Sequence, residues 1–284
     1  MNRNDELVLG AVAYDPKVVT IWEGFKQYFL ERGLPFDFVL YSNYERQVLG
    51  QLNGEHHVSW NSPLAWIEAR RLAGQRGLNV RAIAMRDTDQ DLTSVIVVRA
   101  DSPLKSVADL KGKRVATGAA DSPQATLIPL LFLAEAGLEP GRAFEVQRFD
   151  RLLGKHGDHI GGERDAARAL IAGAVDAACM IDGNHLLFGR DGTWSAGQTR
   201  ILGQTPPYDH CNFTVLDGAA APGRLERFRD LLLEMSYGNA QVRPLLDLEG
   251  LKAWKPGRTE GYAQLERAVD RFGTLTEWLA AHHS

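Results

Sequence analysis

Cysteine is scarce in this chain of 284 residues, and long apolar runs are missing. The two cysteines, Cys179 and Cys211, cannot by themselves form a disulfide framework or a four-ligand structural zinc site. No stretch of about 20 apolar residues is present, so the sequence predicts no transmembrane helix and no direct membrane insertion. The N-terminus lacks the basic region, apolar core and cleavage site of a secretory signal. As written, the chain is expected in the cytoplasm, or in the periplasm if a leader was removed.

An excess of one charge sign is also missing. The chain has 32 basic and 36 acidic residues, with a formal net charge of −4. These charges are interspersed, which makes nucleic acid and anionic membranes poor candidates for partners. A composition of 44% hydrophobic and 24% charged residues is that of an ordinary folded protein and excludes a disordered or collagen-like chain.

Short apolar segments alternate with helical patterns through the first two thirds of the chain. Residues 18–29 repeat apolar side chains at intervals of three and four, which predicts an amphipathic helix. Ser42 or Asn43 is expected to cap the next helix, and Ser62 to open another. Buried strands are predicted at 7–12, 36–40 and 58–60. This order indicates an α/β protein with a mostly parallel sheet covered by helices on both faces.

At two places in the chain, one predicted strand is followed directly by another, without a helix between the two. They are 82–85 with 94–98, and 200–202 with 212–216. We interpret them as two crossovers between two lobes, with residues 1–92 and 208–284 in lobe 1 and residues 93–207 in lobe 2. Ligands in such folds bind at the carboxyl ends of the strands, here expected in the cleft between the lobes.

Several segments resemble the phosphonate/phosphate-type solute-binding proteins of ABC importers, which have the type 2 periplasmic-binding-protein fold. The segments are 41–44, 58–63, 94–103, 106–116 and 166–177. The resemblance covers most of residues 7–217. It implies a two-lobed fold, hinged at two crossovers, that closes its interlobe cleft on a small oxyanion, phosphonate-like or related polar ligand. It further implies the membrane subunit of an ABC transporter as a partner, and it requires no cofactor.

The resemblance also indicates which residues would hold the ligand. An aromatic contact is implied at Tyr44, and Asp182 follows a strand where family members grip the ligand with polar side chains. The helix start at Ser122 presents N–H groups that suit an anion, although Ser122 and Ser62 can equally be plain caps. Glu163 replaces a family histidine, and its carboxylate is expected to repel a phosphonate. The candidate ligand-binding residues are Tyr14, Tyr44, Asn61, Ser62, Ser122, Gln124, Thr126, Glu163, Asp182, Asn184 and His185.

The histidines allow an alternative function. An enzyme on the same scaffold, of a lyase, decarboxylase or cofactor-precursor biosynthesis type, would use His156, His185 and Cys211 as catalytic residues, with or without a metal. His156, His159 and His210 are candidate metal ligands, but no spacing among them matches a metal signature. In the other interpretation, the imidazoles cap backbone groups and Cys211 is a small buried hydrophobe. The binding protein predicts one ligand per chain and no turnover.

Overall fold

The computed structural model describes residues 6–157 and 161–282, and the chain divides into two compact units. Unit 1 contains Met1–Gln90, Asp209–Gly261 and Leu275–Ser284; unit 2 contains Asp91–Tyr208 and Tyr262–Thr274. The chain leaves unit 1 after Gln90 and returns at Asp209, at the two crossovers that the strand pairs indicate. Residues 262–274, which the sequence analysis assigned to the first lobe, are grouped with unit 2.

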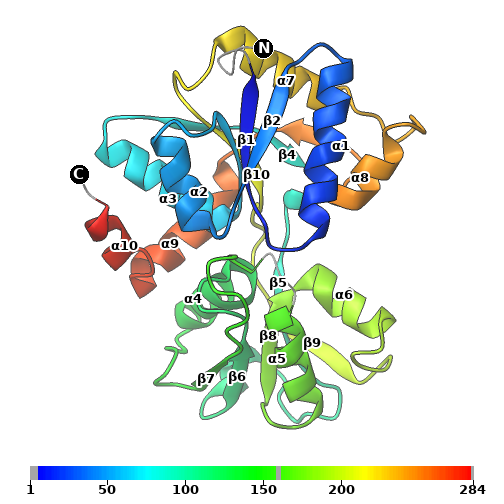
Figure 1. The fold of residues 1–284 in the computed structure, drawn as a ribbon. Coiled ribbons are helices and arrows are strands. Elements are labelled where there is room, and N and C mark those ends of the chain that lie inside the picture. The colour runs from blue at the N-terminus through cyan, green and yellow to red at the C-terminus, as the bar shows by residue number, and fades with distance from the viewer. Residues whose placement is uncertain (1–5, 158–160, 283–284) are drawn as a thin grey trace. The chain divides into compact units, whose positions relative to one another are not determined.

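Unit 1 is built on a six-stranded sheet with the strand order β11-β4-β10-β3-β1-β2 (Figure 1). Its strands are β1 (Leu7–Val12), β2 (Phe36–Tyr41), β3 (Val58–Asn61), β4 (Val80–Arg86), β10 (Asn212–Leu216) and β11 (Trp254–Pro256). Its helices are α1 (Lys17–Glu31), α2 (Tyr44–Leu52), α3 (Pro63–Gln75), the short 3-10 helix η2 (Asp87–Asp89), α7 (Pro222–Leu233), α8 (Arg243–Glu249) and α10 (Thr276–Ala281).

The sheet of unit 1 is mixed rather than mostly parallel. β1 pairs in parallel with β2 and β3, whereas β10 runs antiparallel to β3 and β4, and β11 runs antiparallel to β4. The strands joined by α1, α2 and α3 share one direction, since each helix returns the chain to the same edge. β10 and β11 belong to the segment that returns from unit 2, and they run the opposite way.

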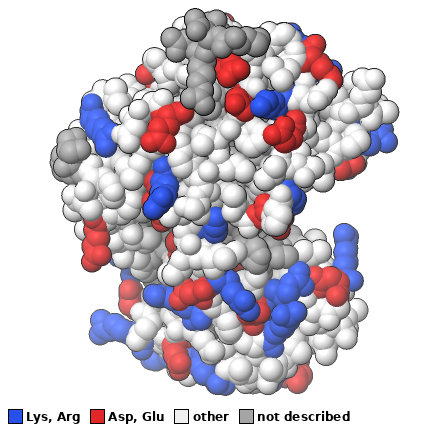
Figure 2. All heavy atoms as spheres, viewed as in Figure 1, with Lys and Arg blue, Asp and Glu red and all other residues white. Residues whose placement is uncertain are grey.

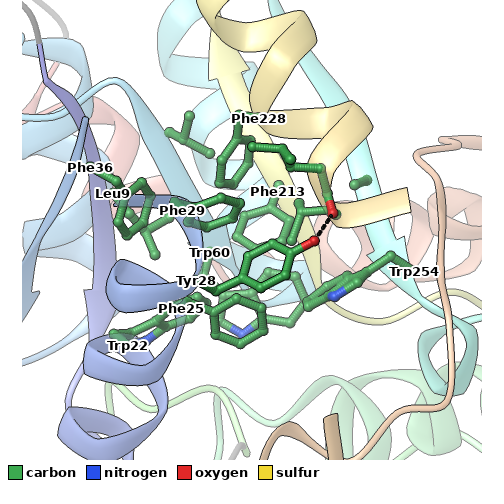
Figure 3. Close-up of a cluster of buried hydrophobic side chains, with 14 of the residues drawn as sticks. Leu9, Trp22, Phe25, Tyr28, Phe29, Phe36, Trp60, Phe213, Phe228 and Trp254 are labelled. Atoms are coloured by element: carbon green, nitrogen blue, oxygen red, sulfur yellow. Dashed lines mark hydrogen bonds between the residues drawn. The ribbon is translucent and has the colours of Figure 1, made fainter. Parts of the chain in front are cut away.

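An aromatic core fills one face of this sheet (Figure 3). Side chains of α1 meet β3, β10, β11 and α7 there, and the Tyr28 hydroxyl donates a hydrogen bond to the Leu231 carbonyl at 2.9 Å. A smaller cluster lies between the sheet and the α2–α3 pair, and Figure 1 shows this pair on the side of the sheet opposite to α1. The main rings of the core are Trp22, Phe25, Phe29, Trp60, Phe213, Phe228 and Trp254.

The two predicted helix caps in unit 1 are confirmed. Asn43, rather than Ser42, caps α2, because its side-chain oxygen accepts a hydrogen bond from Arg46 N at 2.9 Å. The Ser62 hydroxyl accepts from Ala65 N at 3.1 Å and caps α3, and proline occupies the first turn.

Unit 2 has a five-stranded mixed sheet with the order β7-β6-β8-β5-β9. Its strands are β5 (Ser94–Arg99), β6 (Arg114–Thr117), β7 (Glu145–Arg148), β8 (Ala177–Ile181) and β9 (Thr199–Gln204). Its helices are α4 (Ile128–Glu135), α5 (Gly161–Ile171), α6 (Asp182–Arg190) and α9 (Ala263–Phe272), with short turns η3 (Val107–Leu110) and η4 (Pro123–Leu127). Another short turn, η5 (Glu260–Tyr262), precedes α9.

Helices cover both faces of this sheet. α5 and α6 pack on one face, and α4 packs on the other, where Phe272 of α9 joins the cluster. Two ion pairs, Arg267 with Glu135 and Arg271 with Glu139, also join α9 to the segment around α4. These contacts explain why residues 262–274 belong to unit 2.

The surface carries both charge signs. On the face seen in Figure 2, basic and acidic side chains are intermixed, as the sequence composition indicates. Within residues 6–157 and 161–282, no helix has the length and apolarity that crossing a bilayer requires.

Candidate functional site

The turn after β6 forms a capped helix start in unit 2. The Ser122 hydroxyl accepts a hydrogen bond from Ala125 N at 3.2 Å, and the Ser122 carbonyl accepts from Leu127 N at 3.0 Å. Ser122 is almost completely buried. The serine that the sequence singled out therefore caps η4, which uses one lone pair of its hydroxyl oxygen.

Gln124 and Thr126 place polar atoms in the same turn. The Gln124 amide nitrogen donates to the Gly157 carbonyl at 2.6 Å and to Glu163 Oε1 at 3.3 Å. Because both partners are acceptors, they identify the nitrogen, and the other amide atom is Oε1. Gln124 Oε1 and Thr126 Oγ1 are buried and have no hydrogen-bond partner in the described part of the chain.

Glu163 lies in the first turn of α5 and is only 2% exposed. Its Oε2 atom accepts hydrogen bonds from Ile181 N at 3.0 Å and from Asn184 Nδ2 at 2.8 Å. The carboxylate thus binds the start of α6, where the helix dipole favours negative charge. Its charge also acts on Cys179, whose thiol pKa is raised to about 12, mainly by burial and in addition by Glu163.

The three candidates at the start of α6 contact different neighbours. Asp182 accepts a hydrogen bond from the Thr93 hydroxyl at 2.9 Å, whereas Asn184 binds Glu163. His185 Nε2 lies 3.3 Å from the Thr199 hydroxyl, and its ring packs beside Trp194 at a centroid distance of 5.3 Å. Burial lowers the pKa of His185. Consecutive helix positions point in different directions, which explains the divergence.

The link between β5 and the η4 turn was not predicted from the sequence. The Ser94 hydroxyl donates to the Gln124 carbonyl at 2.5 Å and lies 2.8 Å from the Tyr208 hydroxyl. Burial raises the pKa of Tyr208, and the charges of Glu163 and Asp182 add to this effect. A serine opening an otherwise apolar strand was the available signal, because a buried hydroxyl requires a partner.

In unit 1, the candidates at the end of β3 form an internal polar network. Asn61 is fully buried; its Oδ1 accepts from Gln47 Nε2 at 2.7 Å, and its Nδ2 donates to the Thr214 hydroxyl at 2.9 Å. Gln47 was not among the predicted residues, although its Oε1 is buried without a partner among the residues described. Tyr44 is buried in the cluster under α2 and α3, and Tyr14 packs at the edge of the aromatic core.

A second polar cluster in unit 1 surrounds Asp89. Arg86 donates to both Asp89 oxygens, from Nε at 2.6 Å and from Nη2 at 2.8 Å. His210 Nδ1 lies 3.1 Å from Cys211 Sγ and 3.6 Å from Asp89 Oδ1. His210 thus faces the thiol and the carboxylate with the same nitrogen, Nδ1. In a catalytic relay, by contrast, one ring nitrogen contacts the nucleophile and the other contacts the carboxylate. Asp89, His210 and Cys211 each offer one possible metal-ligand atom within 4.8 Å of one another, but both Asp89 oxygens already accept hydrogen bonds from Arg86.

The predicted catalytic and metal-binding residues are divided between the units. His156 and His185 belong to unit 2, whereas His210 and Cys211 belong to unit 1. His156 is buried and has a positive φ of 49°. His159 lies outside the described residues. Cys211 packs in the aromatic core of unit 1, as the interpretation of a small buried hydrophobe expects.

Comparison with known proteins is consistent with the segments noted in the sequence. The chain matches, over residues 11–262, the family described as "ABC transporter, phosphonate, periplasmic substrate-binding protein". The probable ABC transporter phosphite binding protein PhnD1 of Prochlorococcus marinus is 24% identical over 237 residues, which cover 79% of this chain and 74% of that protein.

Solved structures show the same fold. PhnD1 from Prochlorococcus marinus in complex with methylphosphonate has a TM-score of 0.70 at 19% identity, covering 95% of this chain and 99% of that one. XAC2383 from Xanthomonas citri bound to chloride ion has a TM-score of 0.71 at 18% identity, covering 94% and 99%. The predicted α/β, two-lobed type 2 periplasmic-binding-protein fold is thereby confirmed.

The family match extends over most of the chain. The family is described as periplasmic, which does not support the expectation of a cytoplasmic protein. The chain belongs to the family of periplasmic substrate-binding proteins of phosphonate ABC transporters.

Proposed function

We propose that this protein captures one small polar ligand per chain and delivers it, unchanged, to the membrane subunit of an ABC importer. The observation that carries the proposal is the family match over residues 11–262. The ligand class is an oxyanion, a phosphonate-like compound or a related polar compound. Closure of the two units on the ligand would couple binding to recognition by the transporter.

The proposal assigns the ligand contacts to polar groups at the ends of strands in each unit. In unit 2 these are the turn after β6, with Ser122, Gln124 and Thr126, and Asp182 after β8. In unit 1 the corresponding segment is Asn61 with Ser62, at the end of β3. Strand ends of this kind are the usual ligand sites of α/β folds. The buried Oγ1 atom of Thr126, which lacks a partner among the described residues, supports this assignment.

A calorimetric titration tests the proposal. Purified protein is titrated with methylphosphonate, phosphite, phosphate, alkanesulfonates and amino acids, and each compound is recovered and checked by NMR. We expect one compound to bind with a stoichiometry of one and to raise the Tm through mass action. Conversion of the bound compound, or the failure of every compound to bind, would contradict the proposal.

A single substitution then tests the assigned site. Thr126→Val keeps the shape of the side chain and removes a hydroxyl that has no partner among the described residues. It is therefore expected to leave the Tm unchanged and to weaken ligand binding about two- to tenfold, the effect of one hydrogen bond. Thr20→Val, on the exposed part of α1, is the matched control and should leave the affinity unchanged. Equal affinities in the two variants would remove Thr126 from the site.

A further inference from the structure

We infer that His56, a buried histidine of unit 1, is the middle of a hydrogen-bond relay of fixed direction, through which the charge of the exposed Glu55 reaches the interior. The inner end of the relay is Ser59 on β3, and Tyr41 at the end of β2 links the histidine to Glu55. The relay belongs to unit 1 alone, and it does not depend on the ligand of the proposed function.

Three hydrogen bonds join the members of the relay end to end. The Tyr41 hydroxyl donates to Glu55 Oε2 at 2.9 Å and lies 3.0 Å from His56 Nδ1. The other ring nitrogen, His56 Nε2, lies 2.7 Å from the Ser59 hydroxyl. His56 is 1% exposed and Ser59 is fully buried, whereas Glu55 is exposed. The contacts therefore lead from the surface into the core.

The direction of these bonds follows from the number of protons. A carboxylate oxygen only accepts, so the single Tyr41 hydroxyl proton goes to Glu55. The bond between Tyr41 and His56 must then use a proton on Nδ1. Burial lowers the pKa of His56 to about 3, so the ring is neutral at neutral pH and holds only this one proton. Nε2 therefore accepts a hydrogen bond from the Ser59 hydroxyl.

Two glycines provide the space that the relay occupies. A Cβ at Gly10 of β1 would lie 2.4 Å from His56 Nε2, and a Cβ at Gly50 of α2 would lie 2.4 Å from the Tyr41 hydroxyl oxygen. In the sheet, β1 lies between β2 and β3. The imidazole therefore lies over β1 at Gly10 and connects two strands that are not hydrogen-bonded to each other.

The charge of Glu55 strengthens every bond of the relay. A carboxylate that accepts the Tyr41 proton makes the phenol oxygen a better acceptor for the His56 N–H group, since linked hydrogen bonds polarise one another. The same polarisation makes His56 Nε2 a better acceptor for Ser59, and burial reduces the screening. Ser59 precedes Asn61 by two residues on β3, so the charge acts on the strand that carries this candidate residue.

NMR of the unaltered, ¹⁵N-labelled protein tests the direction of the relay. At neutral pH, a long-range ¹H–¹⁵N spectrum of the histidine rings should show His56 protonated at Nδ1. The neighbouring His57 is the internal reference, because its Nδ1 accepts from Val8 N at 2.9 Å and its proton must therefore be on Nε2. A His56 ring protonated at Nε2, or at both nitrogens, would overturn the inference.

Glu55→Gln tests the transmission of charge. The amide keeps an acceptor oxygen and removes the charge, so the Nδ1–H signal of His56 should move to higher field. Glu23→Gln, an equal change in charge on the exposed side of α1, should leave it in place.

Tyr41→Phe removes the link and separates the relay from a direct effect of the charge through space. In this background, Glu55→Gln should no longer shift the Cε1–H signal of the His56 ring. A shift as large as in the protein with Tyr41 would overturn the relay, as would equal responses of His56 to Glu55→Gln and Glu23→Gln.

Discussion

The buried ion pair of Arg86 and Asp89 predicts a large loss of stability when its charge balance is disturbed. Asp89 is 1% exposed, and Arg86 also donates to Glu249 Oε1 at 3.2 Å. Asp89→Asn preserves the shape but places an NH₂ group against guanidinium N–H donors. Removing one partner of a buried pair costs about 3–5 kcal/mol; Glu249 still compensates part of the Arg86 charge, which places the cost at the low end of this range. We expect a decrease of this size in the free energy of unfolding.

The pH dependence follows from the same contacts. Burial alone would raise the pKa of Asp89, but the charge and hydrogen bonds of Arg86 outweigh burial and lower the pKa from 3.8 to about 2. Because this pKa is depressed in the folded state, the carboxylate stabilises the fold above pH 3.8, and this contribution is lost as the pH falls through 2. The difference between the two pKa values corresponds to roughly 2 kcal/mol of the free energy of unfolding. Asp89→Asn should lack this dependence.

Urea unfolding at several pH values, followed by tryptophan fluorescence, measures both effects. Trp60 makes this signal sensitive to the ion pair, because its ring centroid lies 5.1 Å from the guanidinium carbon of Arg86. Asp217→Asn is the matched control, since Asp217 pairs with Arg81 at 2.8 Å but its side chain is 48% exposed. Such an exposed pair contributes at most about 1 kcal/mol. If Asp89→Asn loses no more stability than Asp217→Asn, the reasoning about the buried pair is wrong.

Three further predictions concern unit 1. Gly10→Ala should lower the free energy of unfolding by about 1–3 kcal/mol, because the new Cβ would lie 2.4 Å from His56 Nε2. The control is Gly74→Ala, whose Cβ would meet no atom within 4 Å. Equal Tm values of the two variants in thermal unfolding would contradict the prediction. Burial, aided by the charge of His57, lowers the pKa of His56 to about 3, so stability should fall by up to about 1.4 kcal/mol per unit as the pH drops below 6.5. An NMR titration in which the His56 ring protonates near pH 6.5 would disprove this. Phe213→Ala should lower the free energy of unfolding, measured with urea, by about 3–5 kcal/mol. A loss below about 1 kcal/mol would show that the aromatic core is not the main source of stability in unit 1.

The sequence by itself determined the local elements and the family. Apolar side chains spaced at three and four residues predicted α1, and the pair Ser42 and Asn43 and the residue Ser62 marked the starts of α2 and α3. These features are local, because a helix or strand is encoded by the period of neighbouring side chains and by the cap beside it. The strand ends that carry the candidate residues were predictable for the same reason.

Only the tertiary structure decided what the candidate residues contact. The sequence placed Glu163 at the start of a helix, but its partners Ile181, Asn184 and Gln124 are 18, 21 and 39 residues away along the chain. Likewise, α9 joins unit 2 through ion pairs between residues 132 positions apart. No local period records such pairs, because packing of distant segments brings them together. The physical character of the candidate site is therefore a property of the folded chain.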